Sequence, residues 1–178
     1  EDNKHVAVET GAGANSRVKF KRCIIAAGSR AITLKGIQID SPRVMGSRQA
    51  LQMEDIPKTL LVLGGGYIGL ELGQVYAGFG SKVTCVEMLP GLLPGVDRDL
   101  LRPLLKRLET EFAQICLETK VVGMKEVKDG IEVSFEGRNI PAIKKFDKVL
   151  VSVGRRPNAD LLNLEKAGVE ITDRGFIK

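Results

Sequence analysis

A chain of 178 residues can hold one complete domain and pieces of a second, and its 43% hydrophobic share is that of a globular protein. Glycine or charge interrupts each apolar run before it reaches membrane-spanning length, so no transmembrane helix is expected. The net charge of +5 comes from both ends of the chain rather than from one basic stripe, which argues against nucleic-acid binding.

The first third of the chain is predicted to form short strands, a connector and a small helix. Turn-forming residues at 10–16 predict a loop, and Gly36, Pro42 and Gly46 mark residues 31–46 as a connector. Ser47 is the predicted cap of a helix that ends near Met53. The expected strands are 4–9, 17–20 and 23–27.

Three cysteines, Cys23, Cys85 and Cys116, are far apart and each lies in an apolar strand pattern. We therefore expect buried thiols of a cytosolic protein rather than disulfides, and we expect no metal site. The single histidine, His5, has no partner pattern and is given no role.

The most informative stretch is an apolar strand, 59–63, that runs into a glycine turn and then a helix. Gly64, Gly66 and Gly69 fit the G-x-G-x-x-G pattern of dinucleotide-binding proteins. In that pattern the first glycine permits the tight turn, the second lets a pyrophosphate approach, and the third lets helix and strand pack closely. The helix N-terminus then holds the phosphates. A plain tight turn is the alternative.

An acid follows the next strand, as this motif requires. Residues 82–86 form the expected strand, and Glu87 lies about twenty residues beyond the glycines, in position to accept the adenosine ribose hydroxyls. The acid favours NAD over NADP. A solvated acid at a strand end is the ordinary alternative for Glu87 alone.

The elements that follow the turn complete an α/β pattern. The helix 67–79 should end at Gly80, and a later helix contains Pro103, which requires a cap near Asp99 or a kink. The expected core face of the first helix is Ile68, Leu72, Val75, Tyr76 and Phe79, and that of the second is Leu101, Leu104, Leu105, Leu108 and Phe112.

The remaining pattern switches from helices to strands. A short parallel strand is expected at 115–117, an antiparallel hairpin around 128–130, and a buried strand at 147–154. The predicted fold class is α/β: a Rossmann-like parallel sheet with a small antiparallel β-meander in place of a second crossover helix.

With these elements in order, the chain resembles the flavin-dependent pyridine-nucleotide disulfide oxidoreductases, and among them the dihydrolipoyl dehydrogenases. The resemblance covers the whole chain. The stretches that carry it are 24–29 (IIAAGS), 63–71 (LGGGYIGLE), 86–88 (VEM), 117–121 (LETKV), 151–158 (VSVGRRPN), 167–169 (AGV) and 173–177 (DRGFI). The family's flavin fingerprint, its pair of redox cysteines and its His-Glu pair are not in this sequence, so no catalytic residue is expected here.

The resemblance implies a central fragment of such an enzyme. Residues 1–42 would end the first FAD-domain segment and include a connector, 43–155 would be the NAD-binding domain, and 156–178 would begin the returning FAD segment. The implied NAD contacts are Gly64, Gly65, Gly66, Tyr67, Ile68, Gly69, Glu71, Glu87, Val121, Val153, Gly154 and Arg155. Gly28 and Ser29 would approach FAD in the full enzyme.

The same resemblance implies a function, and alternatives stay open. The full enzyme would oxidise dihydrolipoamide through a disulfide and FAD to NAD, as a cytoplasmic homodimer within a 2-oxoacid dehydrogenase complex. Tyr67 instead resembles an aromatic of NADP-using glutathione reductases, although Glu87 argues against NADP. A free-standing nucleotide-binding module is the third alternative. Glu71 could equally be a plain helix N-terminal carboxylate, and Arg155 a solvated loop charge.

Overall fold

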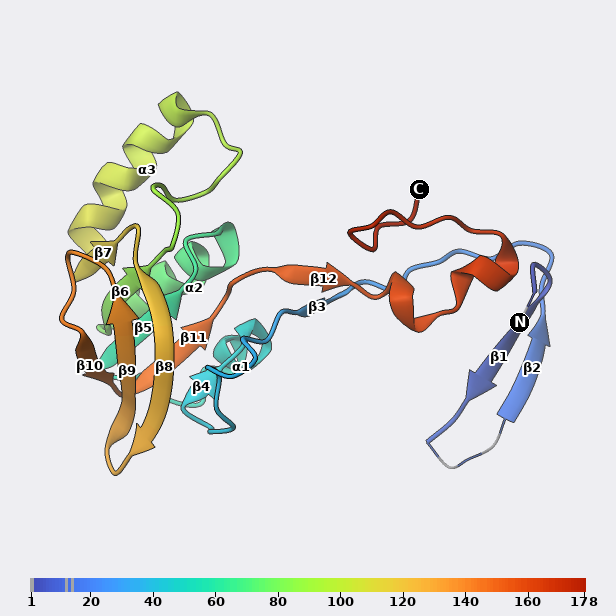
Figure 1. Cartoon of the computed structure of the whole chain (residues 1–178), viewed down its shortest axis with the longest axis horizontal. Helices are drawn as coiled ribbons and strands as arrows, with labels where there is room; N and C mark the ends of the chain where they lie inside the picture. The colour runs from blue at the N-terminus through green and yellow to red at the C-terminus, as the bar shows by residue number, and fades with distance from the viewer. Residues whose placement is uncertain (1, 12, 14) are drawn as a thin grey trace. The chain divides into compact units, whose positions relative to one another are not determined.

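The computed structural model describes residues 2–11, 13 and 15–178, and the chain divides into two compact units. Unit 1 joins Glu1–Arg30 with Arg155–Lys178, and unit 2 is the continuous stretch Ala31–Gly154. The chain can be followed from blue to red in Figure 1. Unit 2 carries the glycine turn and the acid that follows it.

Within the described residues, five strands of unit 2 form one parallel sheet in the order β4-β11-β5-β6-β7. From β5 the chain steps outward to β6 and β7, and it then returns to β11 on the other side of β5 (Figure 1). The strands are β4 (Val44–Met45), β5 (Thr59–Leu63), β6 (Lys82–Val86), β7 (Gln114–Cys116) and β11 (Lys148–Val151). The predicted Rossmann-like sheet is confirmed.

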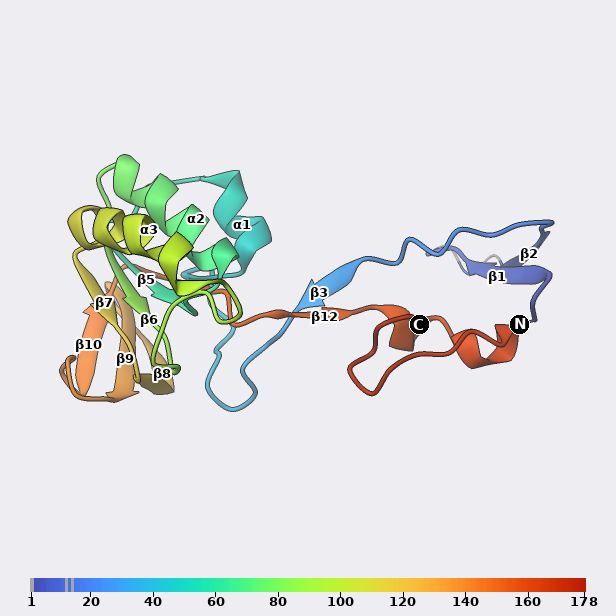
Figure 2. The same ribbon diagram turned by 90° about the horizontal axis from the view of Figure 1, so that it is seen from above.

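The two faces of this sheet are covered differently, as Figure 2 shows. The helices α1 (Ser47–Gln52), α2 (Tyr67–Gly78) and α3 (Arg98–Glu111) lie over one face. An antiparallel sheet of β8 (Lys120–Val127), β9 (Gly130–Glu136) and β10 (Ile143–Phe146) lies over the other. Each interface has its own apolar cluster, so the predicted antiparallel meander replaces a helical layer.

Helix α2 packs on the sheet through part of the predicted apolar face and through two glycines beside it. Its buried residues are Gly69, Leu70, Leu72, Gly73 and Tyr76. Val75 and Phe79, predicted to be in the core, are 42% and 64% exposed. Leu72 and Tyr76 of the predicted face are buried and Ile68 packs against the core, so the prediction is right for these three residues. Gly69 and Gly73 add a close approach that the apolar pattern did not indicate. Gly80 does end the helix, with φ +96° and the bond from the Ser81 N–H to the Tyr76 oxygen that defines a Schellman motif.

The predicted cap Ser47 is wrong, and the cap predicted near Asp99 is Asp97. Helix α1 is preceded by Gly46 rather than capped by Ser47, and the Gly46 N–H donates to the Gln49 side chain at 3.2 Å. Helix α3 begins after Asp97, so Pro103 lies in its second turn instead of its first. The buried side of α3, with Leu101 and Leu108, holds the helix despite the donor that Pro103 lacks.

Unit 1 contains less regular structure. Its hairpin pairs β1 (His5–Glu9) with β2 (Asn15–Lys19), and β3 (Ser29–Ala31) pairs with β12 (Arg155–Pro157). The predicted loop 10–16 is shorter than expected, because 15 and 16 belong to β2; positions 12 and 14 lie outside the described residues. Two short 3₁₀ turns follow β12, η1 (Ala159–Leu161) and η2 (Leu164–Ala167).

The predicted strand 23–27 is wrong. These residues form no strand, and Ile24 is 91% exposed. The apolar run predicted a strand buried in a sheet, but among the described residues no strand pairs with residues 23–27. The prediction of a buried Cys23 fails with it, because Cys23 is exposed.

The other two cysteines, Cys85 and Cys116, are buried as predicted. Burial, together with smaller contributions from the charge of Glu87 and from the neighbouring Cys116, raises the pKa of the Cys85 thiol to about 12. Among the helices that the structure describes, none has the length and apolarity to cross a bilayer.

Candidate dinucleotide-binding site

The segments that follow β5, β6 and β11 meet at the carboxyl edge of the parallel sheet. The Gly64 N–H donates to the Val86 oxygen at 2.9 Å, and the Ser152 N–H donates to the Leu63 oxygen at 2.8 Å. Because the chain leaves β5 for β6 and later returns to β11, the strand order reverses between β5 and β11. Ligands of open α/β sheets bind at such a switch point.

Four glycines lie in the turn and the start of α2: Gly64, Gly65, Gly66 and Gly69. At Gly64 and Gly69 an added side chain would collide with the protein backbone. A Cβ on Gly64, whose φ is +108°, would lie 2.5 Å from the Ser152 carbonyl oxygen. A Cβ on Gly69 would lie 2.4 Å from the Gly64 oxygen and 2.5 Å from the Ser152 hydroxyl. Both distances are far inside van der Waals contact. The first and third glycines of the motif therefore bring α2 and the end of β11 together around the turn.

The other two glycines have opposite surroundings. A Cβ on Gly65 would meet the Leu92 side chain at 2.4 Å and that of Glu87 at 3.2 Å. A Cβ on Gly66 would meet no described atom within 4 Å. Gly66 precedes the first helical residue of α2, where the backbone N–H groups have no partner inside the helix. The open side of the turn is thus at Gly66, beside a helix N-terminus that favours anions.

Glu87 is joined directly to the glycine turn. Its Oε2 accepts the Gly65 N–H at 2.7 Å, and its Oε1 accepts the Leu89 N–H at 2.8 Å. The side chain is half-buried. The acid predicted to follow the second strand and the predicted phosphate turn therefore form one hydrogen-bonded unit.

The other predicted residues of unit 2 lie on several elements. Tyr67 and Glu71 are exposed on the first turns of α2, and Ile68 beside them is half-buried. Val121 is 4% exposed and packs in the cluster between the two sheets. Val153 and Gly154 follow β11, and the Gly154 oxygen accepts the Ile32 N–H at 3.0 Å.

Three predicted residues, Gly28, Ser29 and Arg155, belong to unit 1. The Arg155 guanidinium donates to the Ser29 hydroxyl at 2.8 Å and also to the Ser29 carbonyl oxygen. Arg155 is exposed, and its guanidinium is held by these two acceptors on Ser29. The Gly28 oxygen accepts the Asn158 N–H at 3.1 Å.

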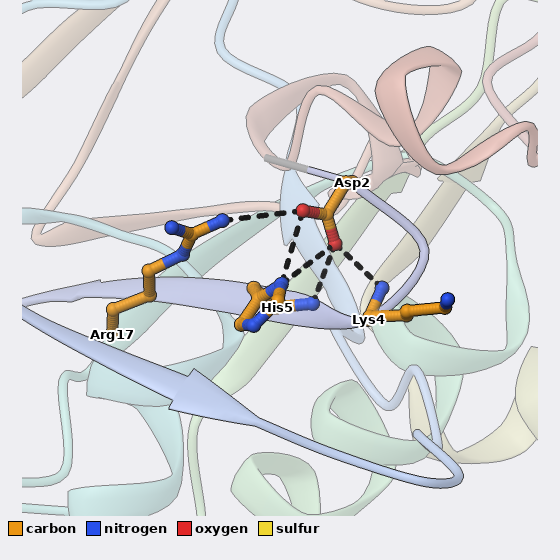
Figure 3. Close-up of polar contacts among 4 residues, drawn as sticks. All are labelled: Asp2, Lys4, His5 and Arg17. Atoms are coloured by element: carbon orange, nitrogen blue, oxygen red, sulfur yellow. Dashed lines mark hydrogen bonds and ion pairs between the residues drawn. The ribbon is translucent and has the colours of Figure 1, made fainter.

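A group of polar contacts in unit 1 centres on the Asp2 carboxylate. Figure 3 shows the Asp2 carboxylate accepting the backbone N–H groups of Lys4 and His5 and contacting the His5 ring and Arg17. These bonds lower the pKa of Asp2 to about 2. They tie the start of the chain to the β1–β2 hairpin. In the residues that the structure describes, no group of histidine, cysteine and acidic side chains could hold a metal ion.

A cavity of about 720 Å³ lies elsewhere in unit 2. It is lined by residues of the segment that leads into α1, including Lys35, Gln38 and Asp40. None of the predicted site residues lines it.

Sequence reasoning did not single out Ser152, Leu92 or Leu93. Ser152 fills the space beside two glycines, and Leu92 is 2% exposed although it lies in a loop rich in Pro and Gly. The sequence did contain a signal for Leu92 and Leu93, because an apolar pair between two Pro-Gly turns predicts that at least one of the two side chains is buried. For Ser152 there was none, because only the fold brings β11 beside the turn.

A twisted parallel sheet with a glycine turn, a helix N-terminus and an acid at its switch point defines the doubly wound, dinucleotide-binding class of folds. The match to known proteins makes this more specific. The chain belongs to the pyridine nucleotide-disulphide oxidoreductase family, whose model matches residues 1–178.

Individual relatives agree with this assignment. The chain is 46% identical over 168 residues to dihydrolipoyl dehydrogenase of Vibrio parahaemolyticus. The matched region covers 94% of this chain and 35% of the relative. A similar solved structure is that of the HOCl-induced flavoprotein disulfide reductase RclA from Escherichia coli, a cysteine-to-serine variant in complex with Cu(II). Its TM-score is 0.88 at 29% identity, and the match covers 99% of this chain and 39% of the reductase chain. The water-forming NADH oxidase from Lactobacillus brevis bound to NADH has a TM-score of 0.81 at 25% identity, covering 97% and 38%. The chain spans about a third of the length of the curated relatives it matches.

Proposed function

We propose that residues 43–155 form the NAD(H)-binding domain of an enzyme of the dihydrolipoyl dehydrogenase type. The observation that carries the proposal is the bond between the Gly65 N–H and the Glu87 carboxylate, beside the open space at Gly66. It sets a ribose-binding acid against a phosphate-binding turn, which is the arrangement that a dinucleotide requires.

The preference for NAD over NADP follows from the same carboxylate. Each oxygen of Glu87 accepts one backbone N–H and keeps a second lone pair, which suits the two hydroxyl donors of the adenosine ribose. The 2′-phosphate of NADP would bring negative charge next to this acid and repel it. The Lactobacillus brevis oxidase is bound to NADH and its engineered variant to NADPH, so this fold accommodates either cofactor and the preference proposed here rests on Glu87.

The remaining contacts follow the edge of the sheet. We assign Gly64 to Gly66 and the α2 start, with Tyr67, Ile68 and Gly69, to the pyrophosphate side, and Val121 to the adenine. Glu71, Val153, Gly154 and Arg155 are assigned to the nicotinamide side. NAD, when bound, supplies the hydride acceptor; this chain's residues bind and orient it. Gly66 leaves room for a phosphate that any side chain would occupy.

The whole enzyme would extend beyond these residues. Its proposed activity is the oxidation of dihydrolipoamide through a disulfide and FAD to NAD, in a cytoplasmic homodimer that serves a 2-oxoacid dehydrogenase complex. Gly28 and Ser29 would lie toward the FAD. Because the three cysteines of the 178 residues are far apart in sequence, we expect this chain alone to bind NADH without oxidising dihydrolipoamide.

One observation favours a second candidate, a disulfide reductase of the glutathione reductase type. Tyr67, at the start of α2, is 63% exposed and therefore available to cover a cofactor ring. Glu87 opposes the NADP use of that group.

Calorimetric titration of the purified chain with NADH and NADPH tests the proposal. We expect NADH to bind more tightly, and Glu87→Gln, which keeps the shape and removes the charge, to reduce the preference. The expected loss of NADH affinity is about 1–3 kcal/mol, the value of charge-assisted hydrogen bonds. Equal or tighter binding of NADPH to the unchanged protein would contradict the assignment.

A further inference from the structure

Gly65 is held on every side by the segment that follows β6. Its N–H donates to the Glu87 carboxylate at 2.7 Å, and its carbonyl oxygen accepts the Leu93 N–H at 2.9 Å. The position where a Cβ would project is filled by a methyl group of Leu92, 2.4 Å from the ideal Cβ site. The middle glycine of the turn is therefore shaped by the loop between β6 and α3.

That loop is anchored although it has no regular structure. Figure 2 shows it running from the end of β6 to the start of α3. Leu92 is 2% exposed and belongs to the apolar cluster under the helices. The first residue of α3, Arg98, donates to the Leu92 carbonyl oxygen at 3.2 Å. Leu93 has φ +49°, a left-handed conformation that a leucine adopts only when its surroundings hold it there.

We propose that Leu92 is a positioning residue for dinucleotide binding: by filling the space beside Gly65 it holds the phosphate-binding turn and the Glu87 carboxylate in register. This inference rests on the proposed function, since it deepens the account of the same site. Leu92 touches neither phosphate nor ribose; it acts through Gly65. Loss of its side chain leaves the turn free to shift away from the carboxylate, and the two halves of the dinucleotide site then no longer match.

The test compares Leu92→Ala with Leu108→Ala, a matched control. Leu108 is 0% exposed, belongs to the same apolar cluster and lies on α3, outside the turn's contacts. We expect Leu92→Ala to weaken NADH binding at least tenfold and Leu108→Ala to change it less than threefold at a similar loss of thermal stability. Leu92→Met, which keeps the volume, should restore the affinity. Equal weakening by the two alanine variants would mean a general loss of structure and would overturn the inference.

A double variant tests the contact itself. Gly65→Ala places a methyl group against Leu92, and Leu92→Ala removes the obstacle, so the double variant should bind NADH at least threefold more tightly than Gly65→Ala alone. A double variant no better than Gly65→Ala would contradict the role of Leu92. If Leu92→Ala does not fold, Leu92→Val and Leu108→Val make the same comparison.

Amide hydrogen exchange separates this inference from the proposed function. Without any ligand, Leu92→Ala should speed the exchange of the Gly65 N–H at least tenfold relative to Leu108→Ala, because its acceptor on Glu87 moves out of register. If the unchanged protein does not bind NADH, the proposed function fails, and the exchange rates alone decide the role of Leu92. Unchanged exchange at Gly65 would refute that role even if NADH binds.

Discussion

Gly66 and Gly69 lie three residues apart, yet the structure predicts opposite consequences for the same substitution. A Cβ on Gly69 would lie 2.4 Å from the Gly64 oxygen, 2.5 Å from the Ser152 hydroxyl and 3.0 Å from Val62. The nearest of these atoms belongs to the backbone and cannot rotate away. We therefore expect Gly69→Ala to lose about 1–3 kcal/mol by overpacking, partly offset by up to about 1 kcal/mol of helix propensity.

Gly66→Ala should behave in the other way. Its added methyl would meet no described atom within 4 Å, and its φ of −81° is an ordinary value for alanine. The cost to stability should stay within about 1 kcal/mol, the usual range for changes at a helix N-cap. The methyl would, however, occupy the space proposed for the pyrophosphate, so the NADH dissociation constant should rise by about tenfold or more, equivalent to about 1.4 kcal/mol.

Thermal unfolding without ligand and NADH titration distinguish the two variants. A net loss of about 1–2 kcal/mol in Gly69→Ala corresponds to a fall in melting temperature of about 2–8 °C for a chain of this size. Gly66→Ala should melt within about 3 °C of the unchanged protein. If Gly66→Ala unfolds at lower temperature than Gly69→Ala and still binds NADH normally, the roles given to the two glycines are wrong.

Three further results are expected. Gly64→Ala should lower the free energy of unfolding by about 3 kcal/mol, measured by denaturant unfolding, because it combines a left-handed φ with a Cβ 2.5 Å from the Ser152 oxygen. A loss below about 1 kcal/mol would contradict this, because the turn would then relax to accept the methyl group. At pH 8 a thiol reagent should modify exposed Cys23 first and reach Cys85, whose pKa burial raises to about 12, only on unfolding; equal rates would contradict this. Folding lowers the pKa of Asp2 from 3.8 to about 2, so the stabilisation of the hairpin by Asp2 is present above pH 3.8 and is lost as the pH falls through 2. NMR of the hairpin between pH 5 and 1.5 measures this loss. The assignment to Asp2 would be refuted by an identical titration of the Asp2→Asn variant.

The part of the fold that the sequence predicts well is the part that depends on local signals. The strand 59–63, the glycine turn and the helix that ends at Gly80 follow one another without interruption, and each has its own residue pattern. The hairpin around Gly130 is equally local, because Asp129-Gly130 between alternating apolar residues favours a tight turn. These elements occur where they were expected.

The failures come from partners that local patterns do not contain. The apolar run at 23–27 resembles a buried strand, but strand formation requires a hydrogen-bonding neighbour, and the described chain provides none for it. The buried face of α2 was predicted only in part: Leu72 and Tyr76 are buried, but counting apolar residues included the exposed Val75 and Phe79 and missed Gly69 and Gly73. For the site, spacing predicted the glycines and Glu87, while the packing of Leu92 on Gly65 depends on how the loop after β6 folds back.

We propose that a dinucleotide binds across the carboxyl edge between β5, β6 and β11. The most direct measurement is an NADH titration of the ¹⁵N-labelled chain followed by amide NMR, which locates the ligand residue by residue. We expect saturable shifts at Gly65, Gly66 and Glu87, with little change around the cavity at Lys35 and Gln38. Absence of saturable shifts, or shifts confined to that cavity, would contradict it.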